Sequence, residues 1–249
     1  MQVVVNKLIT RYELTGKGKT VLLLHGWGDT LAGFHDLTAA LSEKHQVVVL
    51  DLPGFGQTQA PAEAWDLLDY AKFVRDFLKK TKIKPSVIVG HSNGGAIALK
   101  GLGNGVLTAD KLVLLASSGI RGEYKGRVKA ARLITKTGKA LSRPLPSTMR
   151  FRLRRKVYDT IGSDMLVAEN LQESFKKIVA DDVRPDAAKV KIPALLLYGD
   201  KDTATPLSYG KMLADEMPKA ILDDISPAGH FVHHDQPEMV LNRIREFLK

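Results

Sequence analysis

VIVGHSNGGAIAL, residues 87–99, joins two kinds of local pattern through a glycine-bounded serine. The run VIV is typical of a buried strand, and GGAIAL continues at a spacing that suits a buried helix. Between them Ser92 stands in the pattern small-x-Ser-x-small, formed by Gly90 and Gly94. A turn from strand to helix this sharp needs small neighbours, and it pushes the serine out at the carboxyl end of the strand.

Short apolar runs bounded by turn residues recur on both sides of this stretch. They are apolar throughout, as strands covered on both faces of a parallel sheet are. Helix-like segments alternate with them, which predicts an α/β fold with a doubly wound, mostly parallel sheet. We expect an antiparallel hairpin or meander over the first fifteen or so residues. The strands are expected at 20–26, 46–54, 86–92, 111–119, 193–200 and 220–226, and the helices at 30–43, 64–81, 94–103, 207–216 and 236–248.

One long gap, between Gly119 and Pro193, interrupts this alternation. It contains helix-like stretches at 126–141, 148–161 and 165–180, the last with an apolar stripe at helical spacing. We interpret residues 120–189 as a helical cap inserted between two strands of a core formed by 1–119 and 190–249. Ligand sites of α/β sheets lie at the carboxyl ends of the strands, so the cap is expected over that edge.

The composition is that of a globular chain with a full core. The 249 residues are 44% hydrophobic and include no cysteine, which excludes disulfides and a cysteine nucleophile. No apolar run has the length of a membrane span. The N-terminal residues do not have the apolar centre of a signal peptide, so a cytoplasmic location is expected.

Positive charge is concentrated in the predicted cap. Residues 121–156 carry thirteen Lys or Arg and one acid, Glu123, a formal +12 in a chain of net +10. Charge confined to one inserted piece does not indicate a nucleic-acid binder. Three interpretations remain open: a solvated helical face, cations that attract an anionic substrate, and docking of the cap on an anionic membrane surface.

Ser92 is the candidate nucleophile, with a tight packing turn as the alternative. A serine hydroxyl needs a base, and seven histidines compete for that role. His230, in SPAGHF after the last predicted strand, is on a loop that can reach the carboxyl edge of the sheet. We expect His233 and His234 to be capping or surface residues, and His25 to shape the loop after the first parallel strand. The other three are His35, His45 and His91, the last expected to pack in the core or against the turn.

The base in turn needs a carboxylate to hold its tautomer. Asp200 and Asp202 follow a predicted strand in GDKDTATP. We select Asp202 as this acid, because it lies further into the loop and is followed by Thr and Pro residues, and we expect Asp200 to cap the strand end. The order Ser, Asp, His along the chain is the one expected for this fold.

Acyl transfer also requires two N–H groups aimed at the developing oxyanion. Asn93, directly after the candidate nucleophile, offers one main-chain N–H. We expect the second from Trp27, in the loop His25-Gly26-Trp27-Gly28-Asp29 after the first parallel strand. The alternative for Trp27 is an ordinary core residue.

These motifs together resemble the α/β-hydrolase superfamily over nearly the whole chain. The residues that carry the resemblance are HGWGD, DLPGFGQT, GHSNGG, YGDKDTATP and AGHF. It implies Ser92 as nucleophile, Asp202 as acid, His230 as base and oxyanion donors at Trp27 and Asn93, with mostly structural residues in DLPGFG. Haloalkane dehalogenases and epoxide hydrolases are similar but use an aspartate nucleophile, so Ser92 argues against both.

The predicted function is therefore a serine hydrolase of small-molecule esters or thioesters, working through an acyl-enzyme, with no cofactor and no metal. Proline iminopeptidases carry a GGSWG-like motif that GHSNGG does not match. Carbon–carbon bond hydrolases of keto-acid type substrates are an alternative, weakened because they often have Trp where this chain has Phe231. A low-turnover ligand-binding protein on the same fold is the alternative from another class.

Overall fold

Residues 1–121 and 171–249 are described by the computed structural model, and they contain an eight-stranded sheet. Its central strands are apolar on both faces. All five residues of β3 and all six of β7 are buried, for example. The strands are β1 (Gln2–Val5), β2 (Leu8–Thr15), β3 (Thr20–Leu24), β4 (Gln46–Leu50), β5 (Val87–His91), β6 (Lys111–Leu115), β7 (Ala194–Gly199) and β8 (Ala220–Ile225).

The order of strands across the sheet is β1-β2-β4-β3-β5-β6-β7-β8. β1 pairs antiparallel with β2, and β2 antiparallel with β4. Every other pairing is parallel. The predicted mostly parallel, doubly wound sheet is confirmed, and so is the hairpin expected at the N-terminus.

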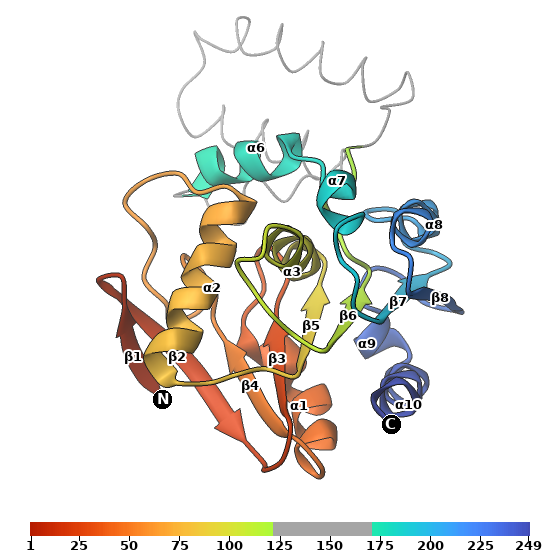
Figure 1. Ribbon diagram of the computed structural model, residues 1–249, viewed down its shortest axis with the longest axis horizontal. Helices are drawn as coiled ribbons and strands as arrows, with labels where there is room; N and C mark the ends of the chain where they lie inside the picture. The colour runs from red at the N-terminus through yellow and green to blue at the C-terminus, as the bar shows by residue number, and fades with distance from the viewer. Residues whose placement is uncertain (122–170) are drawn as a thin grey trace, which may run out of the picture.

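Helices cover both faces of the sheet (Figure 1). Each of the five helices expected outside the cap is present within a few residues of its predicted bounds. The C-terminal one is preceded by a separate short helix, α9. The helical elements are η1 (Leu31–Phe34), α1 (His35–Ser42), α2 (Leu67–Thr81), α3 (Asn93–Gly103), α6 (Gln172–Ala180), α7 (Arg184–Ala187), α8 (Leu207–Glu216), α9 (Val232–Asp235) and α10 (Pro237–Leu248).

Two apolar cores separate the layers. One lies between the sheet and α2, α3, α7 and α8, and includes the fully buried Tyr70 and Tyr198. The other lies between the opposite face and η1, α1, α9 and α10, and includes Phe34 and Ile244. The sheet is therefore sandwiched, and its strand ends are the places where polar side chains can meet.

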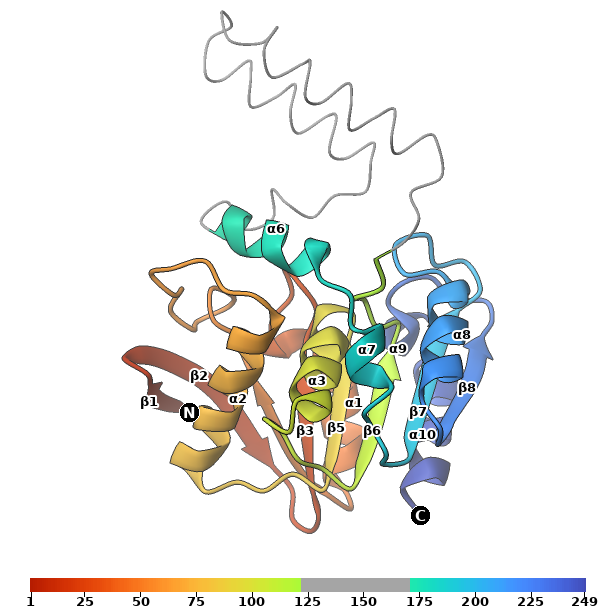
Figure 2. The same ribbon diagram turned by 45° about the horizontal axis from the view of Figure 1, so that its top comes forward.

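The chain between β6 and β7 carries α6 and α7, and α6 lies above the end of the sheet in both views (Figures 1 and 2). Phe175 of α6 packs on Trp27, with ring centroids 5.1 Å apart. Ser174 Oγ accepts a hydrogen bond from the main-chain N–H of Trp65 at 2.9 Å. These contacts set α6 over the loop that follows β3, on the side where the cap is expected.

The segment from α6 to α7 is also tied to α3. Lys100 pairs with Asp181 and Asp186, each at 3.0 Å, and Asn104 donates to Asp186 at 2.9 Å. The helices expected at 126–141 and 148–161, the first part of that at 165–180 and nearly all of the basic segment lie outside the described residues. Within residues 1–121 and 171–249, no helix combines the length and the apolar character needed to cross a bilayer.

Close packing of α3 on β3 depends on Gly94. A Cβ at this position would lie 2.0 Å from the main-chain oxygen of Leu24. Since that oxygen is part of the backbone and cannot turn aside, only glycine fits. Glycine at position 94 is thus required by the packing of helix on sheet, whatever Ser92 does.

We expect Gly94→Ala to lower the free energy of unfolding in urea by about 3 kcal/mol or more, the upper end of the usual overpacking cost. The matched control is Gly105→Ala, where φ is +65° and a Cβ would meet nothing within 4 Å. There only the left-handed backbone is strained, at a cost of about 1 kcal/mol. Equal losses in the two variants would contradict the steric argument.

Candidate active site

Ser92 stands at the turn between β5 and α3 with a strained backbone, φ 49° and ψ −116°. Its N–H donates to Leu115 O at 3.0 Å, and its carbonyl accepts from Ser118 N at 3.1 Å. The turn is therefore held by the neighbouring strand β6 as well as by α3. A non-glycine residue in this region of φ is strained, and such strain persists where the surrounding structure enforces it.

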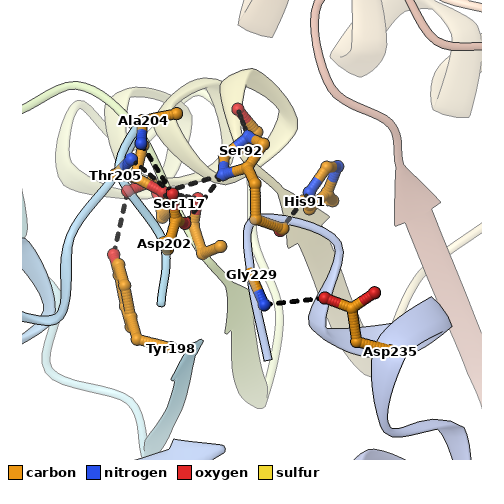
Figure 3. A network of polar contacts seen from close by, with 11 residues as sticks. His91, Ser92, Ser117, Tyr198, Asp202, Ala204, Thr205, Gly229 and Asp235 are labelled. Carbon is orange, nitrogen blue, oxygen red and sulfur yellow. Dashed lines mark hydrogen bonds and ion pairs between the residues drawn. The ribbon is translucent and has the colours of Figure 1, made fainter. Parts of the chain in front are cut away.

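His230 lies in the loop between β8 and α9, and its Nε2 is 3.0 Å from Ser92 Oγ. Two carboxylates hold the residues just before it. Asp200 accepts from the Ala228 N–H at 2.9 Å, and Asp235 accepts from the Gly229 N–H at 2.7 Å (Figure 3). The loop that carries this imidazole is thus fixed from both sides.

Asp202 lies beneath the imidazole, with Oδ2 2.8 Å from His230 Nδ1. Its Oδ1 accepts from the main-chain N–H groups of Ala204 and Thr205 at 2.8 and 2.9 Å. Burial raises the pKa of Asp202, but the hydrogen bonds from His230 and Thr205 outweigh burial and leave this pKa below its ordinary value. The carboxylate is therefore charged at neutral pH and accepts the Nδ1–H of the imidazole.

Thr205 is a part of this arrangement that the sequence did not single out. Its Oγ1 is 2.7 Å from Asp202 Oδ2, 3.0 Å from His230 Nδ1 and 2.9 Å from Ala116 O. A hydroxyl has one proton, which can go to the carboxylate or to the Ala116 carbonyl. In either case Thr205 bridges the loop after β7 to the end of β6.

Asp200 is the other carboxylate considered as the acid. Among the described residues it makes no hydrogen bond or ion pair with the imidazole of His230. It directly follows the last residue of β7, and its carboxylate accepts from the Ala228 N–H and the Ser226 hydroxyl in the loop after β8. Its hydrogen bond from the Ala228 N–H, with that from Ser226, lowers the pKa of Asp200. Asp202 therefore contacts the imidazole of His230, and Asp200 contacts the loop that precedes it.

The loop after β3 passes directly beside Ser92. A Cβ on Gly26 would lie 3.3 Å from Ser92 Cβ, so the residue directly before Trp27 lies against Ser92. Asn93 is the first residue of α3, where main-chain N–H groups have no carbonyl one turn earlier to bond. Its side-chain amide is buried and has no hydrogen-bond partner among the described residues.

His25 fixes the shape of that loop, as the sequence suggested. Its Nε2 accepts from the Leu52 N–H at 2.9 Å, so Nδ1 carries the proton and donates to Gly26 O at 2.8 Å. Burial lowers the pKa of His25, which keeps this tautomer neutral. Both ring nitrogens of His25 are engaged in these hydrogen bonds, so His25 is unsuited to accept a proton from Ser92.

Asp51 gives the DLPGFG motif the structural role expected of it. The buried carboxylate accepts from Leu31 N and Gln57 N, both at 2.8 Å. A Cβ on Gly56 would lie 2.2 Å from its Oδ2. Asp51 thus joins the loop after β4 to the start of η1, and both support the loop that contains Trp27.

A cluster of imidazoles adjoins His230, and one expectation about it was wrong. His233 is 6% exposed, so it is not a surface residue; its ring packs against that of Phe34, with ring centroids 5.2 Å apart. Burial lowers the pKa of His233 to about 3. His234 is exposed, as expected. His91 is buried and contacts the loop of His230, a contact that the sequence pattern did not reveal.

The described residues contain no group of three or more His, Cys, Asp or Glu side chains placed to hold a metal ion. The polar groups that converge are those of Ser92, His230, Asp202 and Thr205, with the Gly26–Trp27 loop and the start of α3 beside them. A hydroxyl, a base within hydrogen-bond reach and a carboxylate behind the base form the arrangement used to activate a nucleophile.

Comparisons with known proteins show the family and the fold of this chain. Residues 21–243 match the model of the alpha/beta hydrolase family. The uncharacterized hydrolase YugF of Bacillus subtilis is 26% identical over 98% of this chain and 95% of its own length. The pimeloyl-[acyl-carrier protein] methyl ester esterase of Chromobacterium violaceum is 29% identical over 90% of this chain and 92% of its own. The enol-lactonase from Burkholderia xenovorans LB400 has a similar fold, with a TM-score of 0.77 at 20% identity, covering 100% of this chain and 99% of that one.

Proposed function

We propose that this chain, which belongs to the alpha/beta hydrolase family, is a serine hydrolase that cleaves carboxylic esters or thioesters of small molecules. One observation carries the proposal: His230 is 3.0 Å from the Ser92 hydroxyl through Nε2 and 2.8 Å from Asp202 through Nδ1. The similarity to an esterase over most of the chain supports the choice of ester chemistry.

In the proposed first step, Ser92 Oγ attacks the carbonyl carbon of the ester while its proton moves to His230 Nε2. The imidazole becomes positively charged, and Asp202, ionised and hydrogen-bonded to Nδ1, stabilises that charge. The carbonyl oxygen becomes an oxyanion, which the main-chain N–H groups of Trp27 and Asn93 stabilise. The proton on His230 then passes to the leaving alcohol or thiol, and the acyl group stays on Ser92.

The second step reverses these roles with water. His230 removes a proton from a water molecule, which attacks the acyl carbon, and the oxyanion forms again at the same N–H groups. Collapse of the intermediate returns the proton to Ser92 Oγ and releases the carboxylic acid. All groups required are on this chain, so the proposal includes no metal and no organic cofactor.

Active-site labelling tests the proposal most cheaply. A fluorophosphonate probe is expected to label the wild-type chain, and Ser92→Ala is expected to lose both the label and turnover of short-chain nitrophenyl esters. The matched control is Ser118→Ala, which removes a nearby hydroxyl. If the wild type were neither labelled nor able to turn over the ester, the proposed hydrolase function would be wrong, and a ligand-binding protein on the same fold would be favoured.

The choice of acid is tested by a pair of carboxylates on one loop. Asp202→Asn is expected to lower kcat by about 10³- to 10⁴-fold, because the side-chain NH2 of Asn can donate to Nδ1 and so favours the tautomer with the proton on Nε2, which cannot accept the serine proton. Asp200→Asn is expected to lower kcat by less than about tenfold, because it affects only the loop before His230. Steady-state kinetics on one nitrophenyl ester compares them, and the opposite ranking would show that Asp202 is not the acid.

A further inference from the structure

We propose that His91 is a positioning residue for catalysis: its imidazole donates Nε2–H to the main-chain carbonyl of His230 and so holds the base against Ser92. The inference rests on the function proposed above for Ser92 and His230. It adds a group that touches neither the substrate nor the reacting atoms. His91 bonds the main chain of His230, so the imidazole of His230 is left free to react.

The contact joins two points of the active site that are far apart in the sequence. His91 Nε2 lies 3.1 Å from His230 O, across 139 residues of chain. His91 is the last residue of β5 and directly precedes Ser92. The same short segment therefore carries the proposed nucleophile and the group that anchors the proposed base, so a displacement of one is transmitted to the other.

The bond also determines the tautomer of His91. A carbonyl only accepts hydrogen bonds, so the proton must be on Nε2. Nδ1 is buried and has no hydrogen-bond partner among the described residues, which fits a nitrogen that carries no proton. Burial lowers the pKa of His91 well below its ordinary value, and the neighbouring His233 and His230 lower it further. The ring is thus neutral when the enzyme works.

Neutrality of this ring matters to the reaction. The ring centroids of His91 and His230 are 5.0 Å apart. A positive charge on His91 would repel the charge that develops on His230 as it accepts the serine proton, which raises the barrier. A buried, neutral donor anchors the loop without that cost.

The surroundings leave the ring little freedom. A Cβ on Gly26 would lie 3.0 Å from His91 Nδ1, so the loop that leads to Trp27 passes along this edge of the ring. Phe231 and His233 lie at centroid distances of 5.0 and 4.8 Å. The imidazole is therefore wedged between the loop of the proposed oxyanion donor and the loop of the base.

Packing alone would explain the burial of His91, but it makes a different prediction for variants. If the ring only fills space, its size matters and the place of its donor does not. If it anchors His230, a donor must stand where Nε2 stands. His91→Gln and His91→Met separate the two roles, since the two side chains are similar in length and volume but only Gln has an N–H donor, near the position of Nε2.

The test compares His91→Gln with His91→Met on one nitrophenyl ester. His91→Met is expected to lower kcat by about 10- to 100-fold, the scale of loss for a catalytic group displaced by about 1 Å, with KM changed by less than about threefold. His91→Gln is expected to keep kcat within about threefold of the wild type. The control His233→Gln alters the same cluster without the bond to His230, and kcat is expected to stay within about threefold.

Equal kcat values for the Gln and Met variants would overturn the inference, while fluorophosphonate labelling of the wild type would leave the proposed function standing. Loss of labelling by the wild type itself would instead remove the proposed function. Should both variants fail to fold, ¹⁵N NMR of the wild-type chain decides. It is expected to show His91 neutral with the proton on Nε2 from about pH 5 to 8, and an Nδ1–H tautomer or a charged ring would contradict the account.

Discussion

The hydrogen bonds of one imidazole, His230, join three segments that are distant in sequence. Nε2 reaches Ser92 Oγ at 3.0 Å, and Nδ1 reaches Asp202 Oδ2 at 2.8 Å. Much of the surrounding structure serves to keep these distances. Asp200, Asp235 and His91 each bond the main chain around His230, and Thr205 bonds the acid. The chemistry that we propose depends on this ring more than on any other group, because it must pass a proton in both directions without moving.

The parallel sheet is what brings these segments together. Strands β5, β7 and β8 run in the same direction in neighbouring or nearby positions, so the residues that follow them emerge at one edge. Ser92 follows β5, Asp202 follows β7 and His230 follows β8. The close approach of α3 to β3, which Gly94 permits, sets the start of α3 beside the loop of Trp27. Fold and site therefore depend on the same local constraints at the end of the sheet.

The sequence was sufficient to predict the strands, because runs such as TVLLL are apolar on both faces only in a covered sheet. It also indicated which Ser, Asp and His would meet, since each follows a strand in a recognisable motif. It did not reveal the Thr205 bridge or the bond from His91 to His230 O. Both join side chains to distant loops, and their formation depends on loop geometry that no periodic pattern encodes. His233 was misjudged for a related reason: a histidine suits a surface as well as a core, so only packing decides.

Trapping of the acyl-enzyme tests the central claim, that Ser92 is acylated with His230 as its base. Mixing the wild-type chain with excess nitrophenyl ester is expected to release a rapid burst of nitrophenol, and mass spectrometry of the quenched protein to find the acyl group on the peptide that contains Ser92. His230→Ala is expected to abolish the burst while leaving Ser92 in place. Turnover without a burst or adduct, or turnover that persists in Ser92→Ala, would contradict the account.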